Sequence, residues 1–329
     1  TNIATTTAGE LARRGHAKSK RSDLRVVGLG VLVSETEHVP LLHRTYPGNS
    51  SDQAVLGSCL QALATLHKEF DSAEGKSGKA QRTVVRDGGF WSEQLELDLG
   101  AAGYGSVISL PLSHAAAKQA LAHAAVRGRM KHLHGALKEV RAARLDAAVG
   151  ELDRTLVVVE SQELLRGQKR GIAVALRKAK IELRKLARRA KARKIDRATL
   201  ETRTKKALAR EHLSDFVVTT ISGRRSLRLH WAVDAERRRV LERTRLGRRV
   251  LCSDRKSWST GRIVYAFRGQ WNVEEVFRRS KRGGLVPWGP SFQWTDSSLR
   301  FHTFATVMGL TLVALVKLAL GSRKSARAV

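Results

Sequence analysis

The first 110 residues alternate between short apolar runs and segments with helical patterning, and this alternation constrains the fold more than any other feature. The apolar runs are rich in Val, Leu and Gly, and turn-forming residues separate them. Alternating strands and helices are typical of an α/β layer fold. Strands are predicted over residues 24–33, 38–46, 81–86 and 104–110, and helices over residues 53–69 and 92–101. The first two strands predict a hairpin, and Asp52 is placed to cap the helix that follows.

The middle of the chain has a different pattern. Residues 114–149 are rich in Ala and His and predict a helix, and residues 164–213 are strongly helical and very basic. Within the latter, apolar residues recur mostly at steps of three and four, as on one stripe of a helix: Ile172, Leu176, Ala179, Leu183, Leu186 and Ala190. Residues 216–221 and 227–233 then predict a second hairpin across Ser222 and Gly223. The basic helices are interpreted equally well as a solvated hairpin and as a hairpin lying along DNA phosphates.

The last part of the chain predicts a short strand over residues 251–254 and a long helix to Lys281, capped by Ser259 or Thr260. The apolar run over residues 304–320 contains Lys317 and is short for a membrane span, which needs about 20 apolar residues. We therefore expect this run to be a buried helix and expect no membrane association.

The charge balance points to a polyanionic partner. Lys and Arg total 61 against 30 acidic residues, which gives a net charge of +31, while the 42% hydrophobic content is sufficient for a core. Such an excess favours nucleic acid, although a solvated basic surface is the alternative. The two cysteines, Cys59 and Cys252, form no C-x-x-C motif, so the sequence indicates neither a zinc ribbon nor a disulfide framework. No Walker loop, Rossmann glycine pattern or H-E-x-x-H motif is found.

Two acidic residues are candidates for chemistry. Asp87 follows the strand predicted over residues 81–86 and precedes two glycines, where an Asp is equally often a helix cap. Glu274 lies in the helix predicted before Lys281, where a Glu among basic residues is by default a surface ion pair. Gln270, Glu274 and Lys281 are spaced i, i+4 and i+11, which places them on one helix face.

The order of several short motifs resembles one family. These motifs are Leu42-His43-Arg44-Thr45-Tyr46-Pro47-Gly48-Asn49 followed by Asp52, the strand before Asp87, Ser92-Glu93, Asp254-Arg255, Trp258-Ser259-Thr260, the Glu274 helix, and Trp294-Thr295-Asp296 with Arg300 and His302. Together they resemble the DDE transposases of bacterial insertion sequences, in the subgroup with a Tyr-x-x-Arg-x-x-x-Glu-x-x-x-x-x-x-Lys signature. The resemblance extends over nearly the whole chain, and its specificity lies in the order and spacing of the motifs.

The resemblance implies an RNase H-like α/β fold, in which helices flank a mixed sheet and a large, mainly helical insertion contains a β-hairpin. The core is then expected over residues 1–113 and 251–320, the second part carrying the Glu helix. The basic helical insertion is expected over residues 114–250, and residues 321–329 are expected to form a frayed tail.

The resemblance also assigns site residues. Asp87 matches the second catalytic Asp of the family and Glu274 the catalytic Glu, so both are expected to bind metal. The family's first Asp is expected immediately before Thr1-Asn2, so we expect this chain to bind DNA but to cut it poorly. The signature Tyr and Arg positions are occupied by Phe267 and Gln270. Residues expected to contact DNA are Lys281, Gln270, Arg268 and Arg278.

The expected reaction is DNA cleavage and strand transfer at insertion-sequence ends. The family's chemistry uses two Mg²⁺ or Mn²⁺ ions, which such sites hold about 3.5–4 Å apart. Expected partners are double-stranded DNA, both transposon end and target, and a second copy of the chain in a dimeric synaptic complex. The expected location is the bacterial cytoplasm, at the nucleoid. Two alternatives stay open: a non-enzymatic basic DNA-binding protein, and an RNase H-like nuclease without strand transfer.

Overall fold

The computed structural model describes most of the chain. It describes residues 2–5, 8–15, 23–35, 38–73, 82–126, 130–224, 226–281, 286, 288 and 293–326. Three sequence expectations fall at least partly outside this description: the role of Thr1, the side chains of Asp52 and Lys281, and residues 327–329 of the expected frayed tail. Residues 321–326 of that tail are helical, at the end of the last helix.

Residue contacts divide the chain into two compact units. Unit 1 contains Thr1–Leu110, Asp146–Thr155 and Leu251–Val329, and unit 2 contains Pro111–Leu145 and Leu156–Val250. The contacts thus group Asp146–Thr155 with unit 1, although this stretch lies within the range expected for the insertion. Each unit has its own buried hydrophobic clusters.

A four-stranded antiparallel sheet in unit 1 is built around β3 (Arg25–Val33). This strand pairs with β1 (Asn2–Thr5), β2 (Arg13–Arg14) and β4 (Pro40–Pro47), so the hairpin expected at this position is confirmed. At Gly28, a Cβ atom would lie 2.1 Å from the ring of Tyr46 on the paired strand, so the sheet needs glycine there.

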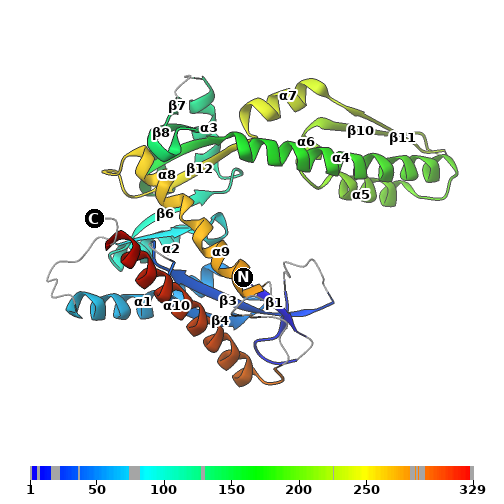
Figure 1. Ribbon diagram of the computed structural model, residues 1–329. Helices are drawn as coiled ribbons and strands as arrows, with labels where there is room; N and C mark the ends of the chain where they lie inside the picture. The colour runs from blue at the N-terminus through cyan, green and yellow to red at the C-terminus, as the bar shows by residue number, and fades with distance from the viewer. Residues whose placement is uncertain are drawn as a thin grey trace. The chain divides into compact units, whose positions relative to one another are not determined.

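Two C-terminal helices pack against this sheet, α9 (Gln270–Lys281) on β3 and α10 (Asp296–Ala326) on β4 (Figure 1). The hydrophobic cluster of this layer includes Val27, Leu29, Trp288, Leu299 and Val307, and Phe277 of α9 packs against it. The α9 helix therefore has one face fixed in the core.

The second sheet has six strands in the order β5-β6-β12-β9-β8-β7. Its β5 and β6 are parallel whereas β7 and β8 are antiparallel, so the sheet is mixed. The strands are β5 (Thr83–Arg86), β6 (Gly105–Leu110), β7 (Lys131–His132), β8 (Val140–Val149), β9 (Leu152–Ser161) and β12 (Arg248–Ser253). The mixed α/β class expected from the sequence is thus confirmed at this level.

Helices of unit 1 cover the β5-β6 part of this sheet. The α2 helix (Glu93–Ala101) and the α8 helix (Thr260–Arg268) pack on β6, and α1 (Asp52–Ala73) packs on α2. Leu63, Leu95 and Leu99 are among the buried residues of the cluster that these elements form. The expected strand–helix–strand order over residues 81–110 is confirmed.

The helix expected over residues 114–149 is wrong beyond its first part. The α3 helix (Ala115–Val126) is present, but the part of the stretch that the structure describes after residue 130 contains β7, the short 3-10 helix η2 (Gly135–Leu137) and β8. Ala, Arg and Leu in β8 favour helix locally, yet this strand lies between β7 and β9 in the sheet. Gly150 connects β8 to β9 and has a φ of 63°, a conformation that glycine adopts readily.

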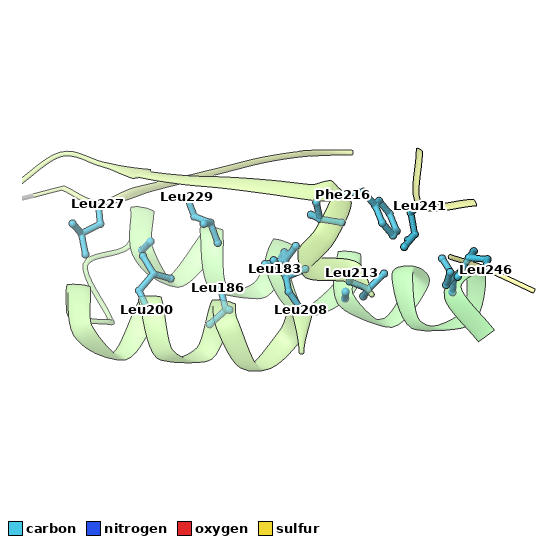
Figure 2. Close-up of a cluster of buried hydrophobic side chains, with 14 residues drawn as sticks. Leu183, Leu186, Leu200, Leu208, Leu213, Phe216, Leu227, Leu229, Leu241 and Leu246 are labelled. Carbon is cyan, nitrogen blue, oxygen red and sulfur yellow. The ribbon is translucent and has the colours of Figure 1, made fainter. Parts of the chain in front are cut away.

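Unit 2 contains the expected basic helices and second hairpin. Its further elements are α4 (Gln162–Lys191), α5 (Arg197–Leu208), α6 (Leu213–Phe216), β10 (Val217–Ser222), β11 (Arg228–Val233) and α7 (Ala235–Thr244). The expected apolar stripe of α4 faces a cluster with α5 and the antiparallel β10-β11 hairpin, where Leu183, Leu186, Leu200 and Leu229 are buried (Figure 2). The buried stripe fixes one face of α4 and leaves the opposite face to solvent.

The single helix expected from Ser259 to Lys281 is two helices. The Ser259 side chain accepts a hydrogen bond from Arg262 N, as a helix cap does, but α8 ends at Arg268. Gly269 forms a turn in which Asn272 N donates to Gly269 O, and α9 starts at Gln270. Arg268 is therefore on a different helix from Gln270 and Glu274.

The expectation of a buried helix over residues 304–320 is wrong in its burial. These residues are helical, within α10, but the large side chains of one long surface are exposed, with Leu312 at 59% and Val316 at 57%. Leu299, Thr303, Val307 and Leu310 face the protein instead. By length and composition alone, Asp296–Gly321 could cross a membrane.

Candidate active site

Asp87 lies at the carboxyl end of β5, at the first residue of an exposed turn. Its Oδ1 atom accepts a hydrogen bond of 2.8 Å from Gly88 N, so the carboxylate caps the 3-10 helix η1 (Gly88–Phe90). The Asp87 side chain is exposed. The strand that leads to it, β5, pairs in parallel with β6. The structure therefore combines the capping role with a position at a strand end that is open to a ligand.

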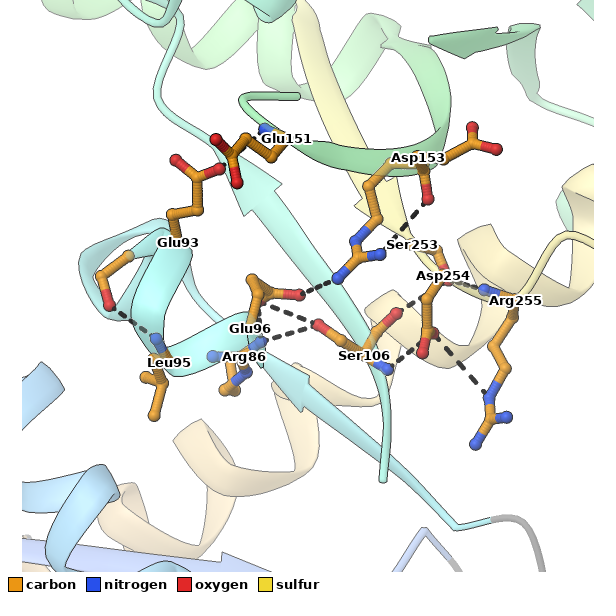
Figure 3. Close-up of polar contacts among 12 residues, drawn as sticks. Arg86, Glu93, Leu95, Glu96, Ser106, Glu151, Asp153, Ser253, Asp254 and Arg255 are labelled. Atoms are coloured by element: carbon orange, nitrogen blue, oxygen red, sulfur yellow. Dashed lines mark hydrogen bonds and ion pairs between the residues drawn. The ribbon is translucent and has the colours of Figure 1, made fainter. Parts of the chain in front are cut away.

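A buried ion-pair network lies directly before Asp87. Arg86 and Glu96 are only 4% and 2% exposed, and Arg86 Nη2 donates to Glu96 Oε1 and, at 2.7 Å, to Ser106 Oγ (Figure 3). Ser106 Oγ donates to Glu96 Oε1 at 3.2 Å. Arg154 Nη2 lies 3.6 Å from Glu96 Oε2 on the other side. One buried carboxylate thus holds two guanidinium groups.

This network anchors the end of β5. Because a buried charge is costly unless it is paired, Arg86 has little freedom to leave Glu96. Arg86 Nε and Nη1 have no hydrogen-bond partner within the described part of the chain, which makes the one ion pair still more important. The backbone that carries Asp87 is therefore fixed by its neighbour. Asp87 itself makes no contact in the network.

The Asp254-Arg255 motif fixes the neighbouring strands. Ser106 N donates to Asp254 Oδ1 at 2.9 Å, and Ser253 Oγ donates to Ser106 O at 2.8 Å (Figure 3). Arg255 reaches the start of β5, where Nε donates to Thr83 Oγ1 at 2.9 Å and Nη2 donates to the Arg82 carbonyl at 2.7 Å. In the structure this motif holds β5, β6 and β12 in register.

Glu274 is exposed on α9. Val276 is buried and Phe277 packs against the hydrophobic cluster, so the face that carries Glu274 is turned outward. Gln270 is the first residue of the same helix, four positions before Glu274, and is half-buried. Arg278 is ion-paired with Glu275, its Nε donating to Glu275 Oε2 at 2.7 Å.

The two acids belong to the same unit, but the structure does not assemble a metal centre around them. The η1 turn after Asp87 packs on α1 and β6, whereas α9 packs on β3, α8 and α10. Among the residues that the structure describes, no group of three or more His, Cys, Asp or Glu side chains is placed to hold a metal ion. A Mg²⁺ site on Asp87 and Glu274 therefore stays a prediction.

The last motif of the resemblance, Trp294-Thr295-Asp296 with Arg300 and His302, lies where α10 begins. The Asp296 carboxylate accepts hydrogen bonds from Glu10 N at 2.7 Å and Leu11 N at 3.3 Å. His302 Nε2 lies within hydrogen-bond distance of the Trp288 carbonyl, at 3.0 Å. These contacts give the last motif a structural role, because they fasten α10 to the N-terminal segment and to the chain after α9.

A shallow pocket on the same unit holds residues that the sequence interpretation did not single out as a site. It is lined by His43, Arg44, Thr45, Ser297, Arg300, Phe301 and Phe304. Burial lowers the pKa of His43, so its ring is neutral near pH 7. The lining combines the motif that contains His43 and Arg44 with the motif that contains Arg300. The sequence shows each motif separately, and the packing of α10 on β4 shows that they share a surface.

No family model matches the chain, and no curated protein is similar to it. The resemblance to DDE transposases therefore rests on the motif residues themselves.

Proposed function

We propose that this chain is the DNA-binding core of a DDE-type transposase with an RNase H-like fold, and that Asp87 and Glu274 belong to its cleavage site. The observation that carries the proposal is the exposed carboxylate of Asp87 at the carboxyl end of β5, a parallel strand. Ligands of open α/β sheets bind outside the carboxyl ends of strands. The buried Arg86–Glu96 pair supports this assignment because it fixes the strand end.

The charge of the chain supports DNA as the substrate. A net charge of +31 is relieved when phosphates share it and counterions are released. Double-stranded DNA in the bacterial nucleoid is the partner that we propose, with a second copy of the chain during synapsis. Lys281, Gln270 and Arg268 are proposed DNA contacts near the cut end. Arg278 contacts DNA in this proposal only if it leaves Glu275.

Two of the three acids of this chemistry lie among the described residues. When bound, Mg²⁺ or Mn²⁺ would activate the attacking oxygen and stabilise the leaving oxygen. Asp87 and Glu274 would hold the metal through carboxylate oxygens, the ligands that Mg²⁺ prefers. Because these acids are exposed and do not form a group of three, we expect efficient cleavage to need a further acid.

Nicking of supercoiled plasmid in Mg²⁺ or Mn²⁺ tests the proposal. The chain as given is compared with a version extended at its N-terminus by a strand that ends in Asp. We expect metal-dependent nicking in the extended version and its loss on Asp87→Ala or Glu274→Ala. Glu275→Ala is the matched control, since it removes an acid one position away. If the control is as inactive as Glu274→Ala, or if the chain as given nicks efficiently, the assignment is wrong.

A non-enzymatic DNA-binding protein is the second candidate function. It is favoured by the hydrogen bond that Asp87 Oδ1 accepts from Gly88 N, because a capping carboxylate has a structural role that needs no metal. DNA binding without nicking in either version would establish this function. Nicking without joined products, in the presence of paired transposon ends, would instead indicate a nuclease.

A further inference from the structure

The α4 helix presents a row of exposed basic side chains, five Arg and one Lys. The row consists of Arg166, Arg170, Arg177, Arg184, Arg188 and Lys191, all of them exposed. Their spacings of four, seven, seven, four and three residues keep them within a sector of about 60° on the helix. From first to last the row extends about 37 Å at 1.5 Å per residue. We call these six residues the arginine row.

The face opposite the arginine row is anchored in a hydrophobic core. Ile172, Ala179, Leu183, Leu186 and Ala190 of α4 are buried against α5 and the β10-β11 hairpin (Figure 2). The helix therefore cannot rotate to hide the row or to bring it to another partner within the unit. The row is a fixed surface of unit 2.

The row is not neutralised within the described part of the chain. The α4 helix has two acids, Glu163 in its first turn and Glu182, which points about 150° away from the centre of the row. Neither forms an ion pair with a residue of the row in the described part of the chain. The described ion pair of α4 is that of Lys169 with Glu242, at 2.8 Å, and Lys169 is not in the row. Like charges four residues apart, as in Arg166 and Arg170 or Arg184 and Arg188, destabilise a helix by about 0.2–0.5 kcal/mol a pair. A polyanion would relieve this repulsion.

The length, straightness and chemistry of the row fit a nucleic-acid duplex. One helical turn of B-DNA is about 34–36 Å long, close to the length of the row, and the duplex carries one charge per about 1.7 Å of its axis. Guanidinium groups bind phosphate oxygens in bidentate geometry, and five of the six residues are Arg. A flexible single strand would not require so long a fixed row.

We propose that the arginine row of α4 binds the phosphate backbone of double-stranded DNA over about one helical turn. The proposal deepens the proposed function and rests on it for the choice of DNA, because it states where the duplex is held. It does not require Asp87 or Glu274 to be catalytic.

The test is fluorescence anisotropy of the full chain with a labelled 30-base-pair duplex, titrated at several salt concentrations. The row variant carries Arg177→Gln, Arg184→Gln and Arg188→Gln. The matched control carries Lys178→Gln, Lys185→Gln and Arg189→Gln, which removes three exposed charges from another sector of the same helix. All six positions are exposed, and circular dichroism checks that both variants keep their helices.

We expect the row variant to lower the slope of log affinity against log salt by about 2.7, because each lost phosphate contact removes about 0.9. At about 0.1 M salt this corresponds to a loss of affinity of about 500-fold. The control should change the slope by less than about one unit. Equal losses in the two variants would show a diffuse charge effect and overturn the proposal, as would a row variant that binds the duplex normally.

Two further outcomes distinguish a failure of the arginine row from a failure of the proposed cleavage site. If the row variant loses duplex binding while no version of the chain nicks plasmid, the row is supported and the cleavage assignment fails. If the extended chain nicks plasmid and the row variant nicks and binds equally well, the cleavage assignment is supported and the row fails. A larger loss for a single-stranded 30-mer than for the duplex would also overturn the row as a duplex surface.

Discussion

Glu96 is a buried carboxylate between two guanidinium groups, so its removal should be among the most destabilising single changes in unit 1. The Glu96→Gln variant keeps the size of the side chain but leaves Arg86 and Arg154 buried without a counter-charge. Breaking a buried pair in this way costs about 3–5 kcal/mol. Urea denaturation followed by circular dichroism would measure the decrease in the free energy of unfolding.

The matched control for Glu96→Gln is Glu35→Gln in the same unit. Glu35 forms a two-pronged ion pair with Arg262, but the Glu35 and Arg262 side chains are 52% and 42% exposed. Exposed pairs contribute about 0–1 kcal/mol, so this variant should be nearly as stable as the parent. Equal losses for the two variants would contradict the account of the buried network.

Cys252 should make the stability of the protein fall in alkaline solution. Burial, together with the negative charge of Glu96, raises the pKa of this thiol from 9.0 to about 12. Between these values the unfolded chain releases the thiol proton and the folded chain keeps it, so stability is present below pH 9 and decreases above it. The contribution is at most about 1.4 kcal/mol per pH unit.

Urea denaturation between pH 8 and pH 10.5, compared with Cys252→Ala, isolates this effect from the titration of other groups. The difference in unfolding free energy between parent and variant should shrink as the pH rises through this window. A difference that stays constant would show that the thiol is not protected in the folded state.

At the scale of elements, α10 offers a direct test of which face is packed. Leu299 is 1% exposed in the cluster with Val27 and Leu29, whereas Leu312 is 59% exposed on the same helix. Leu299→Ala should cost about 2–5 kcal/mol, because it removes buried methyl groups and leaves a cavity. Leu312→Ala should change the unfolding free energy by no more than about 0.5 kcal/mol. Thermal and urea unfolding of the pair would measure both values, and similar costs would mean that α10 is oriented differently.

The elements that the sequence predicted correctly are those whose own periodicity determines them. The β3-β4 hairpin consists of two strand-like runs separated by turn residues, and the α4 stripe recurs at helical spacing, so local pattern and tertiary packing agree. In β8 they disagree. Its Ala, Arg and Leu residues favour helix, and only pairing with β7 and β9 makes the stretch a strand. The exposure of α10 is likewise set by which elements pack on it, which composition does not reveal.

In the candidate site, too, the sequence predicted the residues that belong to local motifs and missed those whose contacts depend on tertiary packing. Asp87 and Glu274 were predicted through motif order, and the structure places Asp87 at a strand end and Glu274 on an exposed helix face. Their role as metal ligands stays a prediction. Arg86 and Glu96 were missed because each looks like an ordinary surface charge in the sequence. Their pairing depends on the packing of α2 on β6, which brings residues ten positions apart into contact. One feature of the sequence could have indicated the buried pair: Arg86 ends the strand Thr83–Arg86, directly before Asp87.

At the scale of the whole molecule, the excess of basic over acidic residues opposes folding and, in the function that we propose, strengthens binding to DNA. A charge of +31 repels itself, and salt screens that repulsion over a Debye length of about 10 Å at 0.1 M. Salt also weakens binding to DNA, because it removes the gain from counterion release. The two effects have opposite signs, so salt should change the stability of the free protein and of the DNA complex in opposite directions.

Thermal unfolding at salt concentrations from about 0.05 to 0.3 M, with and without a 30-base-pair duplex, would measure how salt changes the melting temperature of the free protein and of the complex. Without DNA, the melting temperature should rise with salt as self-repulsion is screened. With duplex at about 100 times its Kd at the lowest salt, binding adds about 2.7 kcal/mol, and this gain should disappear as salt weakens the complex. The two curves should therefore converge at high salt. A stabilisation by DNA that does not change with salt would mean that phosphate contacts do not dominate binding, which would contradict both the proposed substrate and the arginine row.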